Sequence, residues 1–256
     1  MRAMTQITFA VAGSLAVVLT EFARSFAAQT GHAVEIHPGP AGLLTRAIRD
    51  GTLTAEVFVS ASPEGPADLH RAGLFAPPRL LARNRMVLVV GPGPAAAAGD
   101  ALALLADPCR RIGMSTPGAD PSGDYAAAFL ARLAAEDPRR WQNIGTRCVS
   151  LYGDVLPDRH APPRSPALTA LAEGRAEMLI AYATTAERIA RTLPGARILP
   201  LPVRLAPMTE ICTGLRCDSP EPARVFFEAL QGDEARRLLL RHGFLAAPDP
   251  TGPPRD

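Results

Sequence analysis

Short apolar runs alternate along this chain with segments of helical periodicity, and this alternation restricts the fold more than any other feature. The expected strands are 6–12, 33–37, 55–60, 85–90, 111–115, 147–152, 177–182, 197–201 and 209–215. The expected helices are 15–29, 42–49, 66–72, 101–106, 122–135, 166–173, 184–191, 220–231 and 233–241. Repeated strand–helix units predict the α/β class, with parallel sheets that are covered by helices on both faces.

The alternation forms two series, and the 256 residues are enough for two small lobes. We expect two doubly wound lobes that are joined by two hinge crossovers, near 85–91 and near 202–208. Lobe I then comprises 1–86 and 205–256, and lobe II comprises 87–204. A cleft between two lobes is a common place for a ligand.

The apolar N-terminal stretch 7–20 allows two interpretations. Arg2 before it and the small residues around Ala27 are features of a secretory signal peptide. A strand, a turn and a helix with Ser14 as N-cap fit better, because Glu21 and Arg24 would lie badly beside a cleavage site. We therefore expect no separate export signal before the first strand.

The charged residues exclude several functions. The sequence has no lysine, so all 27 of its basic residues are arginines. Schiff-base chemistry and a phosphate-loop lysine both need a primary amine, which this chain lacks. The net charge is only +2 and the arginines are scattered, so no nucleic-acid partner is expected.

The four cysteines are Cys109, Cys148, Cys212 and Cys217, and they lack the CxxC spacing of zinc sites. In an oxidising compartment they allow two disulfides, and Cys212 is close enough to Cys217 to pair locally. Four buried, reduced thiols are the other interpretation. The sequence leaves both open.

Four turns lead from an expected strand into an expected helix through small or hydroxyl residues, at 12–14, 39–42, 121–123 and 164–166. A helix N-terminus exposes unpaired N–H groups and a partial positive charge, so several that meet at one point can bind an anion. Each turn alone is also explained as an ordinary helix cap. Their recurrence in both expected lobes favours an anion site.

Six stretches in order along the chain resemble the molybdate-binding proteins of ABC importers, which have the type II periplasmic binding fold. They are 7–15 (ITFAVAGSL), 39–48 with Gly51, 55–62 (AEVFVSAS), 121–130 (PSGDYAAAFL), 167–183 and 226–244. The resemblance implies capture of molybdate or tungstate in the cleft, delivery to a membrane permease and a periplasmic location. We expect a monomer that needs no cofactor.

The resemblance also implies the ligand-binding residues. Ser14 matches a serine that binds the oxyanion through its side chain and backbone, and Tyr182 matches a tyrosine whose hydroxyl reaches the ligand. Ser122 lies where the family offers a backbone N–H. Arg164, or its neighbour Ser165, aligns with a further backbone donor at a helix start.

Two departures from the family pattern affect the expected specificity. Where the family has consecutive serines, this chain has Pro40, Ala41 and Gly42, so the hydroxyl is missing at Ala41 and only its backbone N–H remains. Arg164 would favour a tetrahedral dianion or a carboxylate if its side chain points inward, and would be merely solvated if it points outward. Another oxyanion or a small organic anion therefore remains the alternative ligand.

The sequence contains no recognisable catalytic set. Its five histidines form no HExxH motif, and no GxSxG motif is present. His160 with Asp154 and Asp158 is the best metal candidate, although its proline-rich loop fits solvent exposure better. Asp120 and Asp124 suit capping at a helix N-terminus. We expect a binding protein rather than an enzyme, with a ligand-sensing domain as a further alternative.

Overall fold

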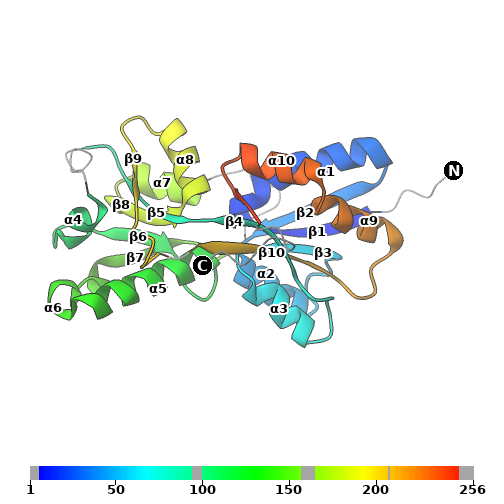
Figure 1. The fold of residues 1–256 in the computed structure, drawn as a ribbon, viewed down its shortest axis with the longest axis horizontal. Coiled ribbons are helices and arrows are strands. Elements are labelled where there is room, and N and C mark those ends of the chain that lie inside the picture. The colour runs from blue at the N-terminus through cyan, green and yellow to red at the C-terminus, as the bar shows by residue number, and fades with distance from the viewer. Residues whose placement is uncertain (1–5, 94–99, 157–164, 207, 248–256) are drawn as a thin grey trace, which may run out of the picture.

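The computed structural model describes residues 6–93, 100–156, 165–206 and 208–247, and these form two separate sheets with helices on both sides (Figure 1). A six-stranded sheet has the order β11-β4-β10-β3-β1-β2. Its strands are β1 (Gln6–Ala12), β2 (Ala33–Gly39), β3 (Val57–Ser60), β4 (Arg79–Asn84), β10 (Thr209–Leu215) and β11 (Leu245–Ala246). Its helices are η1 (Gly13–Leu15), α1 (Ala16–Thr30), α2 (Ala41–Arg49), α3 (Glu64–Arg71), α9 (Glu221–Leu230) and α10 (Asp233–Arg241).

An aromatic cluster attaches the helices α1 and α9 to the six-stranded sheet. The ring of Phe226 on α9 lies 5.0 Å from Phe9 on β1, 5.0 Å from Phe26 and 5.6 Å from Phe22 on α1. Phe22 and Phe26 are four residues apart and therefore share one face of α1. All four rings are buried, so this cluster fixes α1, and the Ser14 turn before it, against the sheet.

The second sheet has five strands in the order β7-β6-β8-β5-β9. They are β5 (Met86–Val90), β6 (Ile112–Ser115), β7 (Cys148–Tyr152), β8 (Met178–Tyr182) and β9 (Arg197–Pro200). The helices of this lobe are α4 (Ala101–Ala106), α5 (Pro121–Glu136), α6 (Pro138–Trp141), η3 (Gly145–Arg147), α7 (Pro166–Ala172) and α8 (Ala183–Thr192). Figure 1 shows α7 and α8 on one side of the sheet and α5 and α6 on the other.

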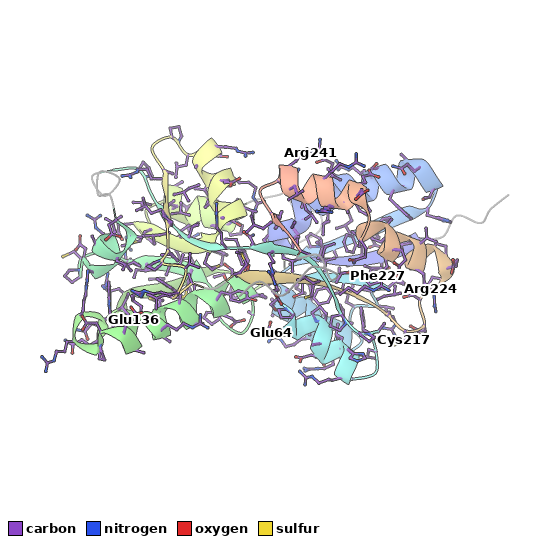
Figure 2. All side chains as sticks on the ribbon, in the orientation of Figure 1. Glu64, Glu136, Cys217, Arg224, Phe227 and Arg241 are labelled. Atoms are coloured by element: carbon purple, nitrogen blue, oxygen red, sulfur yellow. The ribbon has the colours of Figure 1, made fainter. Side chains whose placement is uncertain are left out.

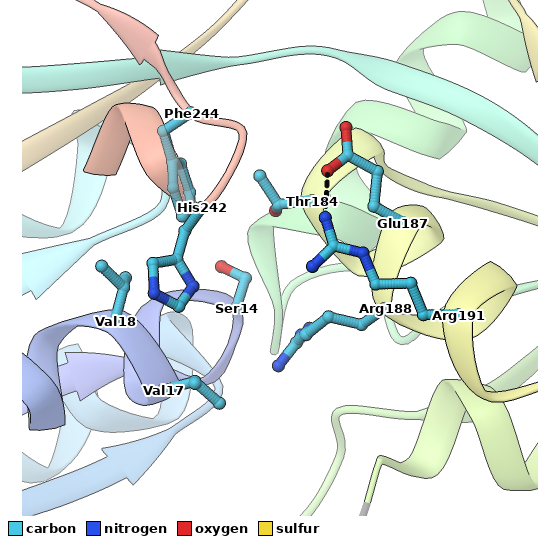
Figure 3. Close-up of a pocket in the computed structure, with 9 residues that line it drawn as sticks. All are labelled: Ser14, Val17, Val18, Thr184, Glu187, Arg188, Arg191, His242 and Phe244. Carbon is cyan, nitrogen blue, oxygen red and sulfur yellow. Dashed lines mark ion pairs between the residues drawn. The ribbon is translucent and has the colours of Figure 1, made fainter. Parts of the chain in front are cut away.

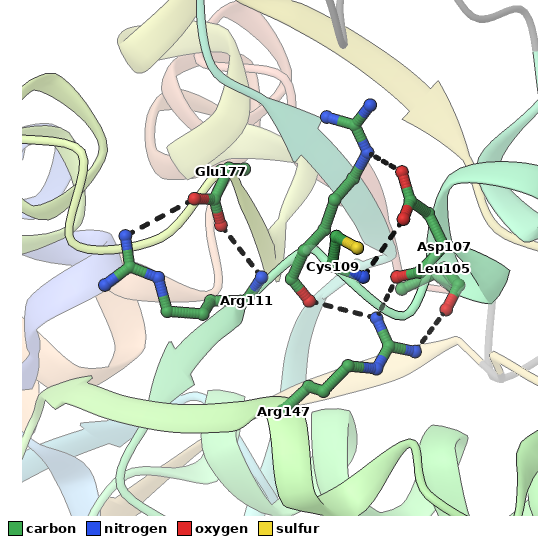
Figure 4. Close-up of polar contacts among 7 residues, drawn as sticks. Leu105, Asp107, Cys109, Arg111, Arg147 and Glu177 are labelled. Carbon is green, nitrogen blue, oxygen red and sulfur yellow. Dashed lines mark hydrogen bonds and ion pairs between the residues drawn. The ribbon is translucent and has the colours of Figure 1, made fainter.

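Arg147 anchors α4 to the rest of the second lobe (Figure 4). Its guanidinium donates to the carbonyl oxygens of Leu105 (2.5 Å), Asp107 (2.6 Å) and Arg110 (3.0 Å). The last carbonyls of a helix have no partner within the helix, so a side-chain donor stabilises the helix end. Arg147 thus fills this role for α4 and the turn that follows it.

The two-lobed α/β fold is the expected one, but both sheets are mixed rather than purely parallel: β1 runs parallel to β2 and β3, and β6 runs parallel to β7 and β8. β10 runs antiparallel to β3 and β4, and β5 runs antiparallel to β8 and β9. The chain crosses from one sheet to the other between β4 and β5 and returns between β9 and β10. Strands β5 and β10 each follow a crossover from the other lobe. They can therefore run opposite to their neighbours, whereas strands joined by a helix within one lobe run parallel. The lobe boundaries 1–86 with 205–256 and 87–204, as units that move against each other, stay a prediction.

The four cysteines are free thiols, so neither of the two disulfides allowed by the sequence is formed. Cys212 on β10 is the only one that is buried, while Cys109 and Cys217 are exposed, and Figure 2 shows Cys217 far from the contact between the lobes. The alternative of four buried thiols therefore holds for Cys212 alone. Within the described ranges, no helix combines the length and the apolar character needed to cross a bilayer.

Candidate functional site

Ser14 lies in the turn between β1 and α1, but it is not the helix cap that was expected. The short helix η1 occupies this turn, α1 begins only at Ala16, and its N-cap is Leu15 without a side-chain bond. Ser14 is half-buried, and its side chain makes no hydrogen bond within the described part of the chain. Its hydroxyl is therefore available to a ligand.

A small cavity separates Ser14 from helix α8 of the other lobe (Figure 3). Ser14, Val17, Val18, His242 and Phe244 line it from the six-stranded lobe, and Thr184, Glu187, Arg188 and Arg191 line it from α8. Its volume is about 30 Å³, which is enough for one or two water molecules. Ser14 thus faces a polar space between the two lobes.

A second cavity of about 270 Å³ is lined by residues of α7, its N-cap and α8. Ser165, Leu168, Arg188, Ile189, Arg191 and Thr192 line it. Ser165 is the N-cap of α7, and its Oγ accepts from the N–H of Leu168 at 3.4 Å. Two predicted residues, Ser14 and Ser165, therefore line separate cavities that have Arg188 and Arg191 in common.

Arg188 is the feature of these cavities that sequence analysis missed. It is half-buried, and burial lowers the pKa of its guanidinium from the ordinary value. A usable signal was its spacing, since Thr184 and Arg188 are four residues apart and share a face of α8. Nothing in the sequence alone shows that this face turns toward the other lobe.

Tyr182 links the two lobes directly. It ends β8, is the N-cap residue of α8 and is buried. Its hydroxyl donates to the carbonyl oxygen of Ala61, which follows β3 of the opposite sheet, at 3.2 Å. Burial and the nearby Asp120 carboxylate raise the pKa of Tyr182 well above its ordinary value, so the phenol remains a hydrogen-bond donor.

Ala41 lies at a second contact between the lobes. Helix α2 begins at Ala41, which is buried behind the N-cap Pro40. The next N–H, of Gly42, donates to the carbonyl oxygen of Ala119 in the turn before α5, at 3.0 Å. A Cβ built on Gly42 would lie 2.7 Å from that oxygen, so this close approach requires glycine.

Ser122 lies on the other side of this contact, at the start of α5. Ser122 is buried, but its N–H is already donated to Oδ1 of the N-cap Asp120 at 3.2 Å. Asp120 therefore caps the helix as expected, whereas Asp124 accepts a bond from the N–H of Gly118, in the turn before the helix, at 2.7 Å. Burial raises the pKa of Asp120 to about 6, against the opposing effect of the Ser122 N–H. A carboxylate thus lies beside a predicted anion donor.

The predicted residues therefore fall into two groups. Ala41, Ser122 and Tyr182 lie where the lobes touch, whereas Ser14 and Ser165 line the cavities beside α8. Arg164, and His160 with Asp158, lie outside the described residues. Among the residues that the structure describes, no group of three or more His, Cys, Asp or Glu side chains could hold a metal ion.

Comparison with known proteins assigns the family. A family model for the bacterial extracellular solute-binding proteins matches residues 7–245. The chain belongs to this family. The uncharacterized protein PM1146 of Pasteurella multocida (strain Pm70) is 30% identical over 176 residues, which are 68% of this solute-binding protein and 72% of that relative.

Solved structures support the two-lobed fold of this solute-binding protein. The periplasmic molybdate-binding protein of Azotobacter vinelandii is similar over 94% of this chain and 99% of its own, with a TM-score of 0.74 and 23% identity. The sulfate-binding protein SubI of Mycobacterium tuberculosis H37Rv is similar over 95% and 88%, with a TM-score of 0.75 and 17% identity. At these identities the likeness concerns the fold, and the two relatives bind different anions.

Proposed function

We propose that this solute-binding protein captures a tetrahedral oxyanion, molybdate or tungstate, between its lobes and delivers it to the membrane permease of an ABC importer. The observation that carries the proposal is the meeting of helix starts from both lobes. The Gly42 N–H at the start of α2 touches Ala119 before α5, and Tyr182 at the start of α8 reaches Ala61. Such a group of helix N-termini favours an anion.

The ligand donors in this proposal are Ser14, the backbone N–H of Ala41, Ser122, Ser165 and Tyr182. On binding, the Ser122 N–H and the Tyr182 hydroxyl exchange their present acceptors, Asp120 and Ala61, for the ligand. A fully deprotonated oxyanion needs only donors, which hydroxyls and backbone N–H groups provide. The molybdate-binding and sulfate-binding relatives have the same fold, which supports a tetrahedral oxyanion as cargo. Molybdate and sulfate carry equal charge, so the protein must select between them by the size of the binding site. The extracellular family supports a periplasmic location.

Asp120 favours a second candidate, a protonated anion such as hydrogen phosphate or an acidic organic phosphate. Such a ligand carries a proton that needs an acceptor, and a buried site without one costs about 1–3 kcal/mol. The Asp120 carboxylate beside Ser122 offers an acceptor of this kind. The missing hydroxyl at Ala41 also departs from the molybdate pattern.

Isothermal titration of the purified, dialysed protein with molybdate, tungstate, sulfate and phosphate tests the proposal. We expect molybdate and tungstate to bind at least about tenfold more tightly than sulfate and phosphate, a difference of about 1.4 kcal/mol. Tighter binding of phosphate would support the second candidate instead. Failure of all four anions to bind would overturn the oxyanion proposal.

A further inference from the structure

The guanidinium of Arg188 has no carboxylate partner among the described residues. The only hydrogen bond of its guanidinium within the described residues runs from Nη2 to Oγ1 of Thr185, at 3.4 Å and three positions away on the same helix. No carboxylate of the described chain forms an ion pair with it. A half-buried guanidinium without a counter-ion is unusual, because burial of an unpaired charge is unfavourable.

The acidic groups around Arg188 are already paired with other cations. Glu187 forms an ion pair with Arg191 at 3.7 Å, as Figure 3 shows. Across the cavity, Glu21 pairs with His242 and Arg241, each at 3.2 Å. The neighbouring charges therefore leave Arg188 as the cation that an incoming anion would meet.

The position of Arg188 is also that of a ligand-binding group. It lines the cavity that holds Ser14 and the cavity that holds Ser165, so it lies between two predicted ligand donors. Figure 3 shows its guanidinium directed from α8 toward the α1 side of the cavity. A guanidinium offers several N–H donors in one plane, which suits the oxygens of a tetrahedral anion.

We infer that Arg188 binds the captured anion and makes the site select tetrahedral dianions over monoanions of the same shape. This inference rests on the proposed oxyanion function and adds a specificity residue to it. The neutral donors bind both kinds of anion, because a hydroxyl or a backbone N–H can donate to the oxygens of either. Arg188 supplies the full positive charge that favours the second negative charge.

The test compares tungstate, a dianion, with perrhenate, a monoanion of the same shape, by isothermal titration at low salt. We expect the wild-type protein to bind tungstate much more tightly than perrhenate. Arg188→Gln should weaken tungstate binding by about 30-fold or more and perrhenate binding far less. Arg188→Lys, which keeps the charge but not the planar donors, should recover part of the preference.

Arg175→Gln is the matched control, because Arg175 lies in the same lobe but is exposed, is paired with Glu173 and lines neither cavity. Its affinities for both anions should stay within about twofold of wild type. The melting temperature of ligand-free Arg188→Gln should not fall, since the change removes an unpaired buried charge; a purely structural arginine would lower it.

The outcomes separate the two claims. An Arg188→Gln variant that binds tungstate as well as wild type, or keeps the same tungstate-to-perrhenate ratio, would overturn the role of Arg188 and leave the oxyanion function standing. If the wild-type protein binds neither tungstate nor the other tetrahedral anions, the proposed function fails and the inference fails with it.

Discussion

The hydroxyl of Tyr182 lies 3.2 Å from the carbonyl oxygen of Ala61 and donates to it from one lobe to the other. The two residues are 121 positions apart in the sequence; Tyr182 ends β8 of one sheet and Ala61 follows β3 of the other. The bond places a donor from β8 at the end of β3, beside the helix starts that the proposed function uses. This bond therefore joins the two lobes at the place where the proposed ligand would bind.

Tyr182→Phe should weaken anion binding with little loss of stability. The change removes one hydroxyl donor and keeps the buried ring, so we expect affinity to fall by about tenfold or more, as for a hydrogen bond to a charged group. The free energy of unfolding should fall by only about 0.5–1.5 kcal/mol. Titration calorimetry and urea unfolding measure the two effects.

Ser14→Ala is the companion variant for this prediction. The Ser14 side chain caps no helix and makes no hydrogen bond among the described residues, so its loss should leave stability unchanged while affinity falls. Wild-type affinity in both variants would remove these residues from the binding site.

Gly42→Ala should hinder the approach of the lobes. The new Cβ would lie 2.7 Å from the carbonyl oxygen of Ala119, a contact that forces a shift of the α2 start. Overpacking of this kind costs about 1–3 kcal/mol, so affinity should fall by about fivefold or more. Gly145→Ala is the control, because nothing lies within 4 Å of the position that its new methyl group would take. Equal affinities of the two variants would show that the contact is dispensable.

Anion binding should become stronger as the pH falls through about 6. Burial raises the pKa of Asp120 from 3.8 to about 6, so Asp120 loses its negative charge over this range. Repulsion from the neighbouring Asp124 carboxylate also raises the pKa of Asp120. The phenols of Tyr152 and Tyr182 stay neutral over this range because their own pKa values are raised. Binding of sulfate or dilute molybdate, whose charge is constant, should strengthen about three- to tenfold between about pH 7.5 and 5.5.

Asp120→Asn provides the control for this pH dependence, because asparagine still caps a helix but does not titrate. The variant should bind at all pH values about as tightly as wild type does at the acidic end. A pH dependence that survives the substitution would assign the effect to another group.

Arg147→Met should destabilise the second lobe. The substitution keeps a long side chain but leaves the carbonyls of Leu105, Asp107 and Arg110 without their donor. We expect the free energy of unfolding to fall by about 1–3 kcal/mol, measured by urea denaturation. Arg175→Met, which removes only an exposed pair with Glu173, should change it by less than about 0.5 kcal/mol. Equal losses would contradict the role given to Arg147.

Much of the fold could be predicted because hydrophobic periodicity marks each element locally. The strand β1 and the helices α4 and α10 have the predicted ends. Strand β4 was missed because its sequence, RLLARN, contains no long apolar run and is extended by pairing with β10 and β11. The antiparallel direction of β5 and β10 was missed for a different reason, because an apolar run is equally buried in either direction.

The sequence located some candidate residues in their turns, but their roles as ligand donors stay predictions. Tyr182 ends β8 as expected, and Ala41 begins α2 one residue before the expected helix start. Arg188 and Asp120 could not be recognised in this way, because their importance depends on tertiary burial and on which partners surround them. Ser14 shows the reverse case, since its turn was found but its expected capping bond does not exist.

A crystal structure of the protein with tungstate, located by the anomalous scattering of tungsten, tests the proposed anion site directly. We expect one strong tungsten peak between the lobes, within hydrogen-bond distance of Ser14 and Tyr182. A peak confined to the outer surface, or a cleft without tungsten at saturating tungstate, would contradict this proposal.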